Sequence, residues 1–314
     1  MRVIYPLQDA SETLQNTVVA IGVFDGVHRG HQEILTQTVR EAKSQGLSPV
    51  ALTFDIHPAE MFTPERSPPY IASLAQRAAL IETYGGGIET VAIARFDRTY
   101  AALSPEAFVS DILETQLGAG HVLVGADFRY GRHRAGSVTT LLEAGARCGF
   151  TVTIVPPILI HGERVSSTQI RGLISAGDLP AATDLLGHPF VVEGTVRHGK
   201  QLGRTLGYPT ANLHPIQPRQ LLPGNGVYAA FARLESGQTV RAAVSVGTNP
   251  TTDTDDARKV EAYLMDGFTG DLYGQKFSLD FREKVRDEQK FSSLDALVCQ
   301  MALDVSEIAE RLAE

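Results

Sequence analysis

The stretch GVFDGVHRGH at residues 22–31 decides the fold of the first half of the chain. It overlaps the end of the apolar run VVAIGVF (residues 18–24), which is typical of a strand buried on both faces. Apolar residues then recur at helical spacing over residues 34–42, so we expect a turn from a strand into a helix. Ligands of open α/β sheets bind at the carboxyl ends of strands, which makes this turn the first candidate site.

The two histidines of this turn, His28 and His31, are three residues apart and therefore share one face of the first helical turn. Free backbone amides at the start of a helix attract anions. Each helix-end charge effect contributes only about 0.3–1 kcal/mol, so catalysis needs several donors acting together. Two imidazoles and these amides predict a site for an α-phosphate in transfer. The glycine spacing fits neither the GxGxxG motif of dinucleotide enzymes nor a P-loop.

Strand and helix signals alternate through the rest of the first half. Further strands are expected at residues 49–54, 90–94, 121–125 and 151–155, and helices at residues 74–84 and after Ser104. Ser104 can cap the free amides of its helix, and Pro105 at the first helical position loses no hydrogen bond. This alternation indicates an α/β fold with a mostly parallel sheet and helices on both faces.

The pattern changes after about Gly187. Short strands without helices between them are expected at residues 190–197, 227–234, 239–246, 259–265 and 275–281, which favours a small antiparallel barrel or sandwich. The chain ends in an amphipathic helix capped by Ser293, whose apolar stripe from Leu294 to Leu312 is expected to pack on the barrel. We therefore expect two domains, residues 1–187 and 188–314, joined near residues 187–189.

The composition fits two globular domains. The 314 residues carry a net charge of −8, and 43% of them are apolar. The acidic balance argues against broad nucleic-acid binding, which needs a basic face. The longest apolar run, residues 151–160, is too short to span a bilayer, and residues 1–15 show no secretory signal. We expect a cytoplasmic protein with no nucleic-acid and no membrane partner; its oligomeric state is left open.

A second motif, RVSSTQIR at residues 164–171, places three hydroxyls before a helix, with Arg171 three residues after Thr168. Hydroxyls and free amides can hold phosphate oxygens, and an arginine adds a bidentate donor. By itself such a segment is more often a plain helix cap, and the motif at residues 22–31 favours the phosphate site. The basic loop FRYGRHR (residues 128–134) either lies over a polyanionic substrate or is a solvated face.

The third motif lies in the second half, at residues 198–212 (HGKQLGRTLGYPTAN), where glycines allow a close approach to a ligand. If its end is extended, Thr210 and Asn212 point to the same side and offer the hard oxygen ligands that magnesium prefers. Glu261 stands between apolar neighbours in KVEAYLM, a setting that raises a carboxyl pKa and suits a general base. The alternative is a water-exposed glutamate at the rim of a site.

Together these motifs resemble the bacterial bifunctional riboflavin kinase/FAD synthetase (FMN adenylyltransferase) family. In the first half the similar segments are GVFDGVHRGH, LTFDIHP (52–58), VGADFRYG (124–131) and RVSSTQIR. In the second half they are GRTLGYPTAN, SVGTNPT (245–251), KVEAYLMD, DLYG (271–274) and VRDEQKF (285–291). The resemblance implies a Rossmann-like nucleotidyltransferase domain followed by a small antiparallel β-barrel domain with a C-terminal helix. It also implies two reactions that use ATP and Mg²⁺: riboflavin is phosphorylated to FMN, and FMN is adenylated to FAD with release of pyrophosphate.

The resemblance also implies roles for individual residues. The catalytic residues would be His28, His31 and Glu261, with Glu261 accepting the proton of the ribityl 5′-hydroxyl. Asp127 and Tyr208 would bind flavin, and Thr210 and Asn212 would bind metal and phosphate. The residues implied to bind ATP or its phosphates are Gly22, Phe24, Asp25, Gly26, His28, His31, Arg164, Ser167, Thr168, Arg171, Gly199, Gly203 and Arg204.

Two positions depart from the family pattern: Thr252 stands where an aromatic residue often occurs, and Tyr263 stands where histidine is common. Neither removes a group that the chemistry requires. The expected partners are the small molecules ATP, riboflavin and FMN. Two alternatives remain: an enzyme in which only one half turns over substrate, and a flavin- or nucleotide-binding regulator without catalysis.

Overall fold

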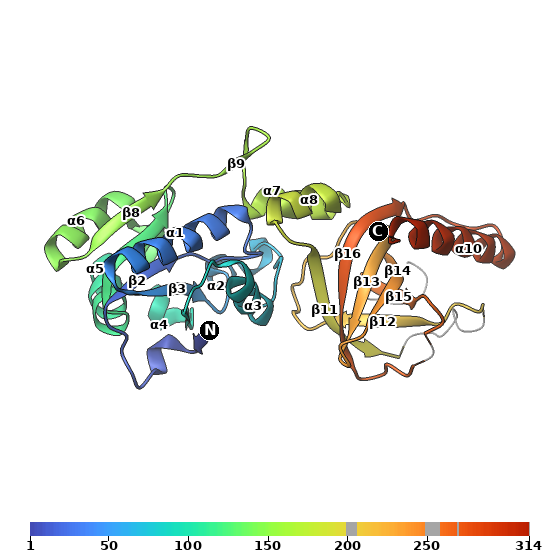
Figure 1. Ribbon diagram of the computed structural model, residues 1–314, viewed down its shortest axis with the longest axis horizontal. Coiled ribbons are helices and arrows are strands. Elements are labelled where there is room, and N and C mark those ends of the chain that lie inside the picture. Colours follow the sequence, from blue (N-terminus) through green and yellow to red (C-terminus); the bar gives the residue numbers. More distant parts are fainter. Residues whose placement is uncertain (199–205, 249–257, 269, 314) are drawn as a thin grey trace. The chain divides into compact units, whose positions relative to one another are not determined.

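The computed structural model describes residues 1–198, 206–248, 258–268 and 270–313 (Figure 1). It divides into two compact units, residues 1–68 with 74–166 and residues 69–73 with 167–314. This division lies earlier in the chain than the boundary expected after Gly187. The expected boundary therefore stays a prediction about the chain, which limited proteolysis can test.

The first unit contains a six-stranded sheet with the order β1-β4-β3-β2-β5-β8, in which every neighbouring pair is parallel. Its strands are β1 (Arg2–Ile4), β2 (Thr17–Ile21), β3 (Ser48–Phe54), β4 (Thr90–Ala94), β5 (Ala119–Gly125) and β8 (Thr151–Val155). Its helices are α1 (Arg29–Gln45), α2 (Pro58–Phe62), α3 (Leu74–Tyr84), α4 (Arg98–Ala101), α5 (Pro105–Ala107), the π-helix η3 (Phe108–Gln116) and α6 (Val138–Cys148). Two short hairpins complete it, β6 (Arg129–Tyr130) with β7 (Gly136–Ser137), and β9 (Leu159–Ile160) with β10 (Glu163–Arg164).

Helices cover both faces of this sheet because successive strand residues point to opposite sides. One face packs against α1 and α3 and is formed by Val18, Ala20, Ala51, Val91, Ile93 and Leu123. The other packs against η3 and α6 and is formed by Val19, Ile21, Val50, Leu52, Ala92, Ala94, Val122 and Val124. The central strands are therefore mainly apolar on both faces, as the sequence predicts for a buried parallel sheet.

The second unit is built on a closed antiparallel barrel, which the described residues form in the order β11-β12-β15-β14-β13-β16. Its six strands are labelled in Figure 1. The strands are β11 (Phe190–Arg197), β12 (Thr210–Pro215), β13 (Gly226–Leu234), β14 (Thr239–Gly247), β15 (Lys259–Leu264) and β16 (Lys276–Arg286). The helices are α7 (Ser167–Ala176), α8 (Leu179–Leu186) and α10 (Leu294–Arg311). The fold class predicted from the sequence, a parallel α/β sheet followed by a small barrel and a terminal helix, is thus confirmed.

Two segments outside the barrel are joined to the second unit, one by apolar packing and the other by backbone hydrogen bonds. Helix α8 buries Leu179 and Leu186 and contacts β11 and β16. At residues 69–73, the Tyr70 N–H donates to the carbonyl of Arg219 at 2.8 Å, and the Leu221 N–H donates to the carbonyl of Tyr70 at 2.8 Å. Such backbone pairs join segments far apart in sequence, which local patterns do not reveal.

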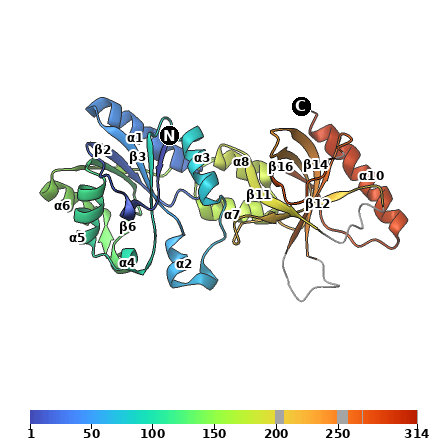
Figure 2. The ribbon, with the colours of Figure 1, turned by 90° about the horizontal axis from the view of Figure 1, so that it is seen from below.

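The terminal helix α10 lies along the barrel (Figure 2) and begins at Ser293, whose hydroxyl accepts the Ala296 N–H at 3.1 Å. Ile308 and Leu312 pack in one cluster with Ala229 and Met265 of the barrel. Leu294, the first residue of the predicted stripe, is instead 65% exposed because it stands at the free end of the helix. No helix in the described part of the chain is long and apolar enough to cross a membrane.

Candidate active sites

The turn between β2 and α1 has a constrained backbone. Phe24, Gly26 and Val27 have φ values of 51°, 76° and 37°, in the left-handed region that only glycine adopts without strain. The side chains of Phe24 and Val27 are fully buried, which holds the turn in this conformation. Strained residues of this kind cluster at ligand sites, where the surrounding structure fixes them.

This turn brings the two predicted histidines together. The Nδ1 atom of His28 accepts the backbone N–H of His31 at 3.3 Å and so caps α1. The two imidazole rings stack with centroids 3.6 Å apart, and the Phe24 ring meets His31 edge-on at 5.3 Å. His28 is buried. Both imidazoles are therefore positioned by the first turn of α1, on the shared face that their spacing predicts.

A buried arginine supports the turn from the neighbouring strand. Thr53 of β3 donates its hydroxyl to the carbonyl of Val23 at 3.0 Å. The Nη1 atom of Arg77 donates to the Thr53 hydroxyl at 3.3 Å and to the carbonyl of Phe54 at 2.7 Å. Arg77 is only 1% exposed, so its charge and its donors lie inside the fold beside the strand ends. The sequence carries no signal for Arg77, because it lies near the start of an ordinary helix.

A side chain at Gly30 would meet its surroundings closely. A Cβ atom there would lie 3.2 Å from two atoms of the His28 ring and 3.9 Å from the carbonyl oxygen of Val165. The start of the second predicted motif, at residues 164–166, therefore approaches the turn at residues 22–31. The structure thus brings these two motifs together within the first unit.

Arg164 of the second motif pairs with Asp127. Its Nη2 atom lies 2.8 Å from the Asp127 Oδ2 atom, and the pKa of that carboxyl is lowered by this hydrogen bond and by the nearby positive charge. Both side chains are more than half exposed, which limits an ion pair of this kind to about 0–1 kcal/mol. The pair leaves Arg164 accessible to a phosphate.

The first unit has a cavity of about 680 Å³ beside this turn. It is larger than the cavity of about 390 Å³ in the barrel unit. Gly22 and Val23 form one edge of the larger cavity. Its aromatic lining consists of Phe54, Phe62, Phe96, Tyr100, Phe108, Phe128 and Tyr130. Several of these rings meet edge-on, for example Phe54 and Phe96 with centroids 5.5 Å apart. The lining suits a planar aromatic ligand.

These aromatic residues were not predicted from the sequence, although a signal existed. Phe54 ends β3, Phe96 follows β4 and Phe128 follows β5. The carboxyl ends of parallel strands meet at one edge of a sheet, so these three rings had to converge. His133 and Arg134 of the predicted basic loop also line the cavity and have φ values of 56° and 58°. The loop therefore borders this cavity.

The remaining residues of the second motif belong to the other unit. Ser167, Thr168 and Arg171 lie on the first turns of α7. The Arg171 Nε atom donates to the carbonyl of Pro69 at 2.8 Å, within that unit. Their association with the histidines rests on the sequence motif.

The barrel places the predicted kinase residues on two paired strands. In the pairing of β12 with β15, Asn212 lies opposite Glu261 and Thr210 lies opposite Tyr263. Ala211 and Val260 alternate with them and are buried in the barrel interior. The segment at residues 210–215 is therefore extended, and the oxygens of Thr210 and Asn212 share the strand face that carries Glu261.

Glu261, Thr210, Tyr208 and Tyr263 line the cavity of about 390 Å³, between the outer face of the barrel and α10. Burial raises the pKa of the Glu261 carboxyl, and Lys259 opposes this shift. Among the residues that the structure describes, none donates a hydrogen bond to the Glu261 carboxylate. A carboxylate that is poorly solvated and not hydrogen-bonded is a stronger proton acceptor, as a general base requires.

The donor set fits magnesium bound together with a nucleotide. Thr210 and Asn212 offer a hydroxyl and an amide oxygen, with the Glu261 carboxylate on the adjacent strand. The described residues hold no cluster of three or more His, Cys, Asp or Glu side chains that could bind a metal. Mg²⁺ commonly takes one or two protein oxygens, substrate phosphates and water, which matches this sparse set. Gly199, Gly203, Arg204 and Thr252, named in the sequence analysis, lie outside the described residues.

Comparisons with known proteins find a family match for each half of the chain. A sequence model of the FAD synthetase family matches residues 10–169, and one of the riboflavin kinase family matches residues 186–312. These ranges correspond to the sheet unit and the barrel unit except at residues 1–9, at residues 69–73 and around α7 and α8.

The relatives match along nearly the whole chain. A bifunctional riboflavin kinase/FMN adenylyltransferase of Pseudomonas fluorescens is 39% identical over 307 residues, which cover 98% of this chain and 96% of the relative. An enzyme of the same name from Listeria monocytogenes is 36% identical and covers 97% and 96% of the two chains. A crystal structure described as a macrolide-efflux protein of Streptococcus pneumoniae has a TM-score of 0.85 at 32% identity, with 99% and 98% of the two chains covered.

Proposed function

Since the chain belongs to the family of bifunctional riboflavin kinase/FMN adenylyltransferases, we propose that its barrel unit phosphorylates riboflavin and its sheet unit adenylates the resulting FMN. The observation that carries this proposal is the presence of two separate cavities, each bordered by its own phosphate-handling motif. One is lined by Glu261 and Thr210, and the other by Gly22 and Val23 of the turn that carries His28 and His31.

In the kinase reaction, Glu261 accepts the proton of the ribityl 5′-hydroxyl while that oxygen attacks the γ-phosphorus of ATP. The bond from the γ-phosphorus to the bridging oxygen breaks, so the products are FMN and ADP. Thr210 and Asn212 are the residues that hold the metal and the phosphates, and Tyr208 contacts the flavin. Mg²⁺, when bound with ATP, supplies positive charge to the phosphate oxygens.

In the adenylyl transfer, a phosphate oxygen of FMN attacks the α-phosphorus of a second ATP. The bond between the α-phosphorus and the oxygen of the leaving pyrophosphate breaks, which gives FAD and pyrophosphate. His28, His31 and the amides at the start of α1 stabilise the negative charge that develops on the α-phosphate. Gly22, Phe24, Asp25 and Gly26 shape the turn that presents these groups.

In this proposal Arg164 exchanges its contact with Asp127 for phosphate oxygens of ATP. The expected roles of Ser167, Thr168 and Arg171 as further ATP ligands rest on the sequence motif. The aromatic cavity binds the FMN ring system, with Asp127 on the loop that follows β5. A cytoplasmic location, where ATP and FMN are available, belongs to the same proposal.

The test measures both reactions in each of two single variants. Glu261→Gln should abolish FMN formation from riboflavin and preserve FAD formation from supplied FMN. His31→Ala should do the reverse. If either substitution removed both activities in a folded protein, the assignment of one reaction to each unit would be wrong. If the unmodified chain bound flavin with no turnover at all, the regulatory alternative would replace the proposal.

A further inference from the structure

The wall of the barrel cavity contains a buried ion pair that the proposed chemistry does not use. The Arg286 Nε atom donates to the Asp304 Oδ1 atom at 2.8 Å, and its Nη2 atom donates to Oδ2 at 2.7 Å. The side chains are only 16% and 6% exposed. Gln300 adds a third donor to Asp304 at 2.9 Å. This bidentate pair joins the end of β16 to the middle of α10.

Arg286 also holds an aromatic ring. Its guanidinium carbon lies 5.7 Å from the centroid of the Phe291 ring, within the range of a cation–π contact. Asp304 thus fixes Arg286 from one side, and the face of Arg286 orients Phe291. Arg286, Phe291 and Asp304 all line the cavity that contains Glu261.

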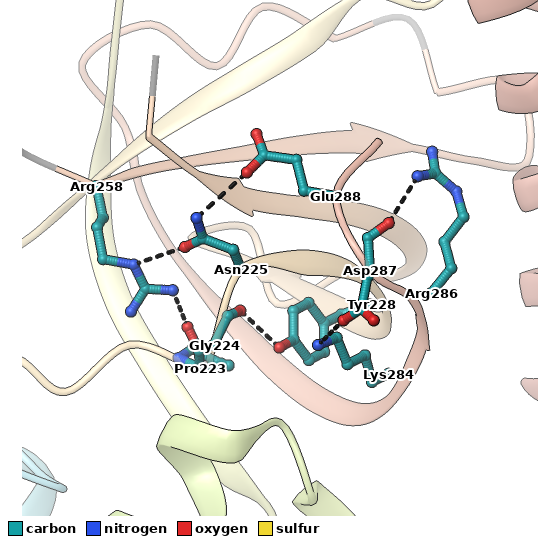
Figure 3. A network of polar contacts seen from close by, with 9 residues as sticks. All are labelled: Pro223, Gly224, Asn225, Tyr228, Arg258, Lys284, Arg286, Asp287 and Glu288. Atoms are coloured by element: carbon teal, nitrogen blue, oxygen red, sulfur yellow. Dashed lines mark hydrogen bonds and ion pairs between the residues drawn. The ribbon is translucent and has the colours of Figure 1, made fainter. Parts of the chain in front are cut away.

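The segment between Arg286 and Phe291 is anchored at further points (Figure 3). Arg286 donates to the carbonyl of Asp287 at 3.0 Å, and Lys284 pairs with the Asp287 carboxylate at 2.5 Å. Asn225 donates to Glu288 at 3.2 Å and accepts from Arg258 at 3.1 Å. The chain that carries Phe291 is therefore held before any ligand arrives.

The cavity wall next to this ring is apolar. It is made by Leu297, Met301 and Val305 of α10, which lie on the same side of the helix as Asp304. An aromatic ring and three aliphatic side chains suit a flat ligand with a large apolar face. The carboxylate of Glu261 lies elsewhere in the same cavity and suits the hydroxyl-bearing tail of such a ligand.

We propose that Arg286 and Asp304 are positioning residues for the flavin ring in the kinase site, acting through Phe291. The pair fixes the Phe291 ring as one wall of the slot that receives the isoalloxazine, and so sets the affinity for riboflavin without taking part in phosphoryl transfer. This inference rests on the proposed kinase function of the barrel.

The experiment compares Asp304→Asn with the unmodified chain. Riboflavin binding is measured by the quenching of flavin fluorescence, and the kinase reaction by steady-state kinetics. We expect the Kd and the KM for riboflavin to rise about tenfold, with kcat changed less than about twofold. FAD formation from supplied FMN, measured in the same samples, should be unchanged and so reports on intact protein.

Asp266→Asn is the matched control. Asp266 pairs with Arg241, which also reaches α10 by donating to the carbonyl of Ala309 at 3.2 Å, but neither residue lines this cavity. The control should leave the KM for riboflavin unchanged. A second test, the double variant Arg286→Met with Asp304→Leu, replaces the pair by apolar side chains that preserve packing. It should also raise the KM for riboflavin, because Phe291 loses the guanidinium that orients it.

Three results would overturn the inference: an unchanged riboflavin KM in Asp304→Asn, an equal rise in Asp266→Asn, or an affinity equal to that of the unmodified chain in the double variant. Arg286→Lys provides the test if Asp304→Asn does not fold, since it retains the charge and loses the planar contact with Phe291. Failure of the unmodified chain to form FMN would instead contradict the proposed function.

Discussion

Asn212 of β12 lies directly opposite Glu261 of β15 in the antiparallel pairing of these strands. Facing residues of such a pair have their Cβ atoms about 4.5–5.5 Å apart, so the amide and the carboxylate serve one small volume. They are separated in sequence by nearly fifty positions, and the barrel alone brings them together. In the proposed kinase reaction, this pairing would bring the proton acceptor Glu261 beside the amide oxygen of Asn212 at the phosphate site.

Glu261→Gln should stabilise the protein while it removes kinase activity. Burial raises the pKa of Glu261, so this group favours the folded state at pH below its unfolded pKa, and that contribution is lost as pH rises through the folded pKa. At pH above the folded-state pKa the ionised carboxylate therefore opposes folding, and glutamine removes this opposition. We expect FMN formation to fall about 10²–10⁴-fold and the Tm to rise, by roughly 2–4 °C for each kcal/mol recovered.

Glu193→Gln is the control for that prediction. Burial also raises the pKa of Glu193 on β11, and Lys276 opposes the shift as Lys259 does for Glu261. Glu193 does not line the kinase cavity. The control should raise the Tm at neutral pH and retain FMN formation. A Tm that fell in Glu261→Gln at neutral pH would contradict the account of its pKa.

The rate of FMN formation should decline on the acid side as Glu261 becomes protonated. The positive charge of Lys259 lowers the pKa of this carboxyl, so Lys259→Met should move the acid limb of the pH profile to higher pH. The limb is measured as kcat/KM for riboflavin against pH, with FAD formation from FMN in the same variant as the reference. A shift to lower pH, or equal shifts in both reactions, would count against Glu261 as the base.

His28 is expected to have two separable roles. Its Nδ1 atom caps α1, and loss of such a cap costs about 0.5–2 kcal/mol. His28→Asn retains a capping side chain, whereas His28→Ala does not. Both variants should reduce FAD formation at least about a hundredfold and spare FMN formation, but only the alanine variant should lower the Tm appreciably. If His28→Asn retained adenylyl transfer, the catalytic role of His28 would be contradicted and only its capping role would remain.

Gly30→Ala should impair adenylyl transfer through His28. The added Cβ atom would lie 3.2 Å from the His28 ring and must displace it. We expect FAD formation to fall about tenfold, with FMN formation unchanged. Gly172→Ala is the matched control, because a Cβ atom at this helical position meets nothing within 4 Å. It should leave both rates unchanged and stabilise the protein by about 0.5–1 kcal/mol. Equal losses in the two variants would contradict the assignment.

Much of the fold follows from local sequence patterns. The strands at residues 90–94, 151–155 and 190–197 and the helix at 74–84 begin and end where the sequence predicts, since period and turn signals suffice for each. Closure of the barrel was not predictable in this way. It depends on the pairing of β11 with β16, whose residues are about ninety positions apart, and a local pattern carries no information on such a partner. Local patterns likewise do not predict that residues 69–73 pair with the second unit, because their partners are about 150 positions away.

The site residues that could be predicted are also those with a local signal in the sequence. His28 and His31 could be found because one turn carries both, and Glu261 because its apolar neighbours are adjacent in sequence. Arg77, the aromatic cavity of the first unit and the Arg286–Asp304 pair were missed. Each depends on side chains from separate elements that meet only in the folded chain. The rule that parallel strand ends converge would have found Phe54, Phe96 and Phe128.

The most direct test of the two-site account is a time course. The purified chain is incubated with riboflavin, ATP and Mg²⁺, and the flavins are separated by chromatography at successive times. The account predicts that FMN appears first and that FAD follows as FMN is consumed. FMN that accumulates without FAD, although ATP remains, would contradict adenylyl transfer by the sheet unit. Riboflavin that stays unconverted would contradict the kinase assignment of the barrel.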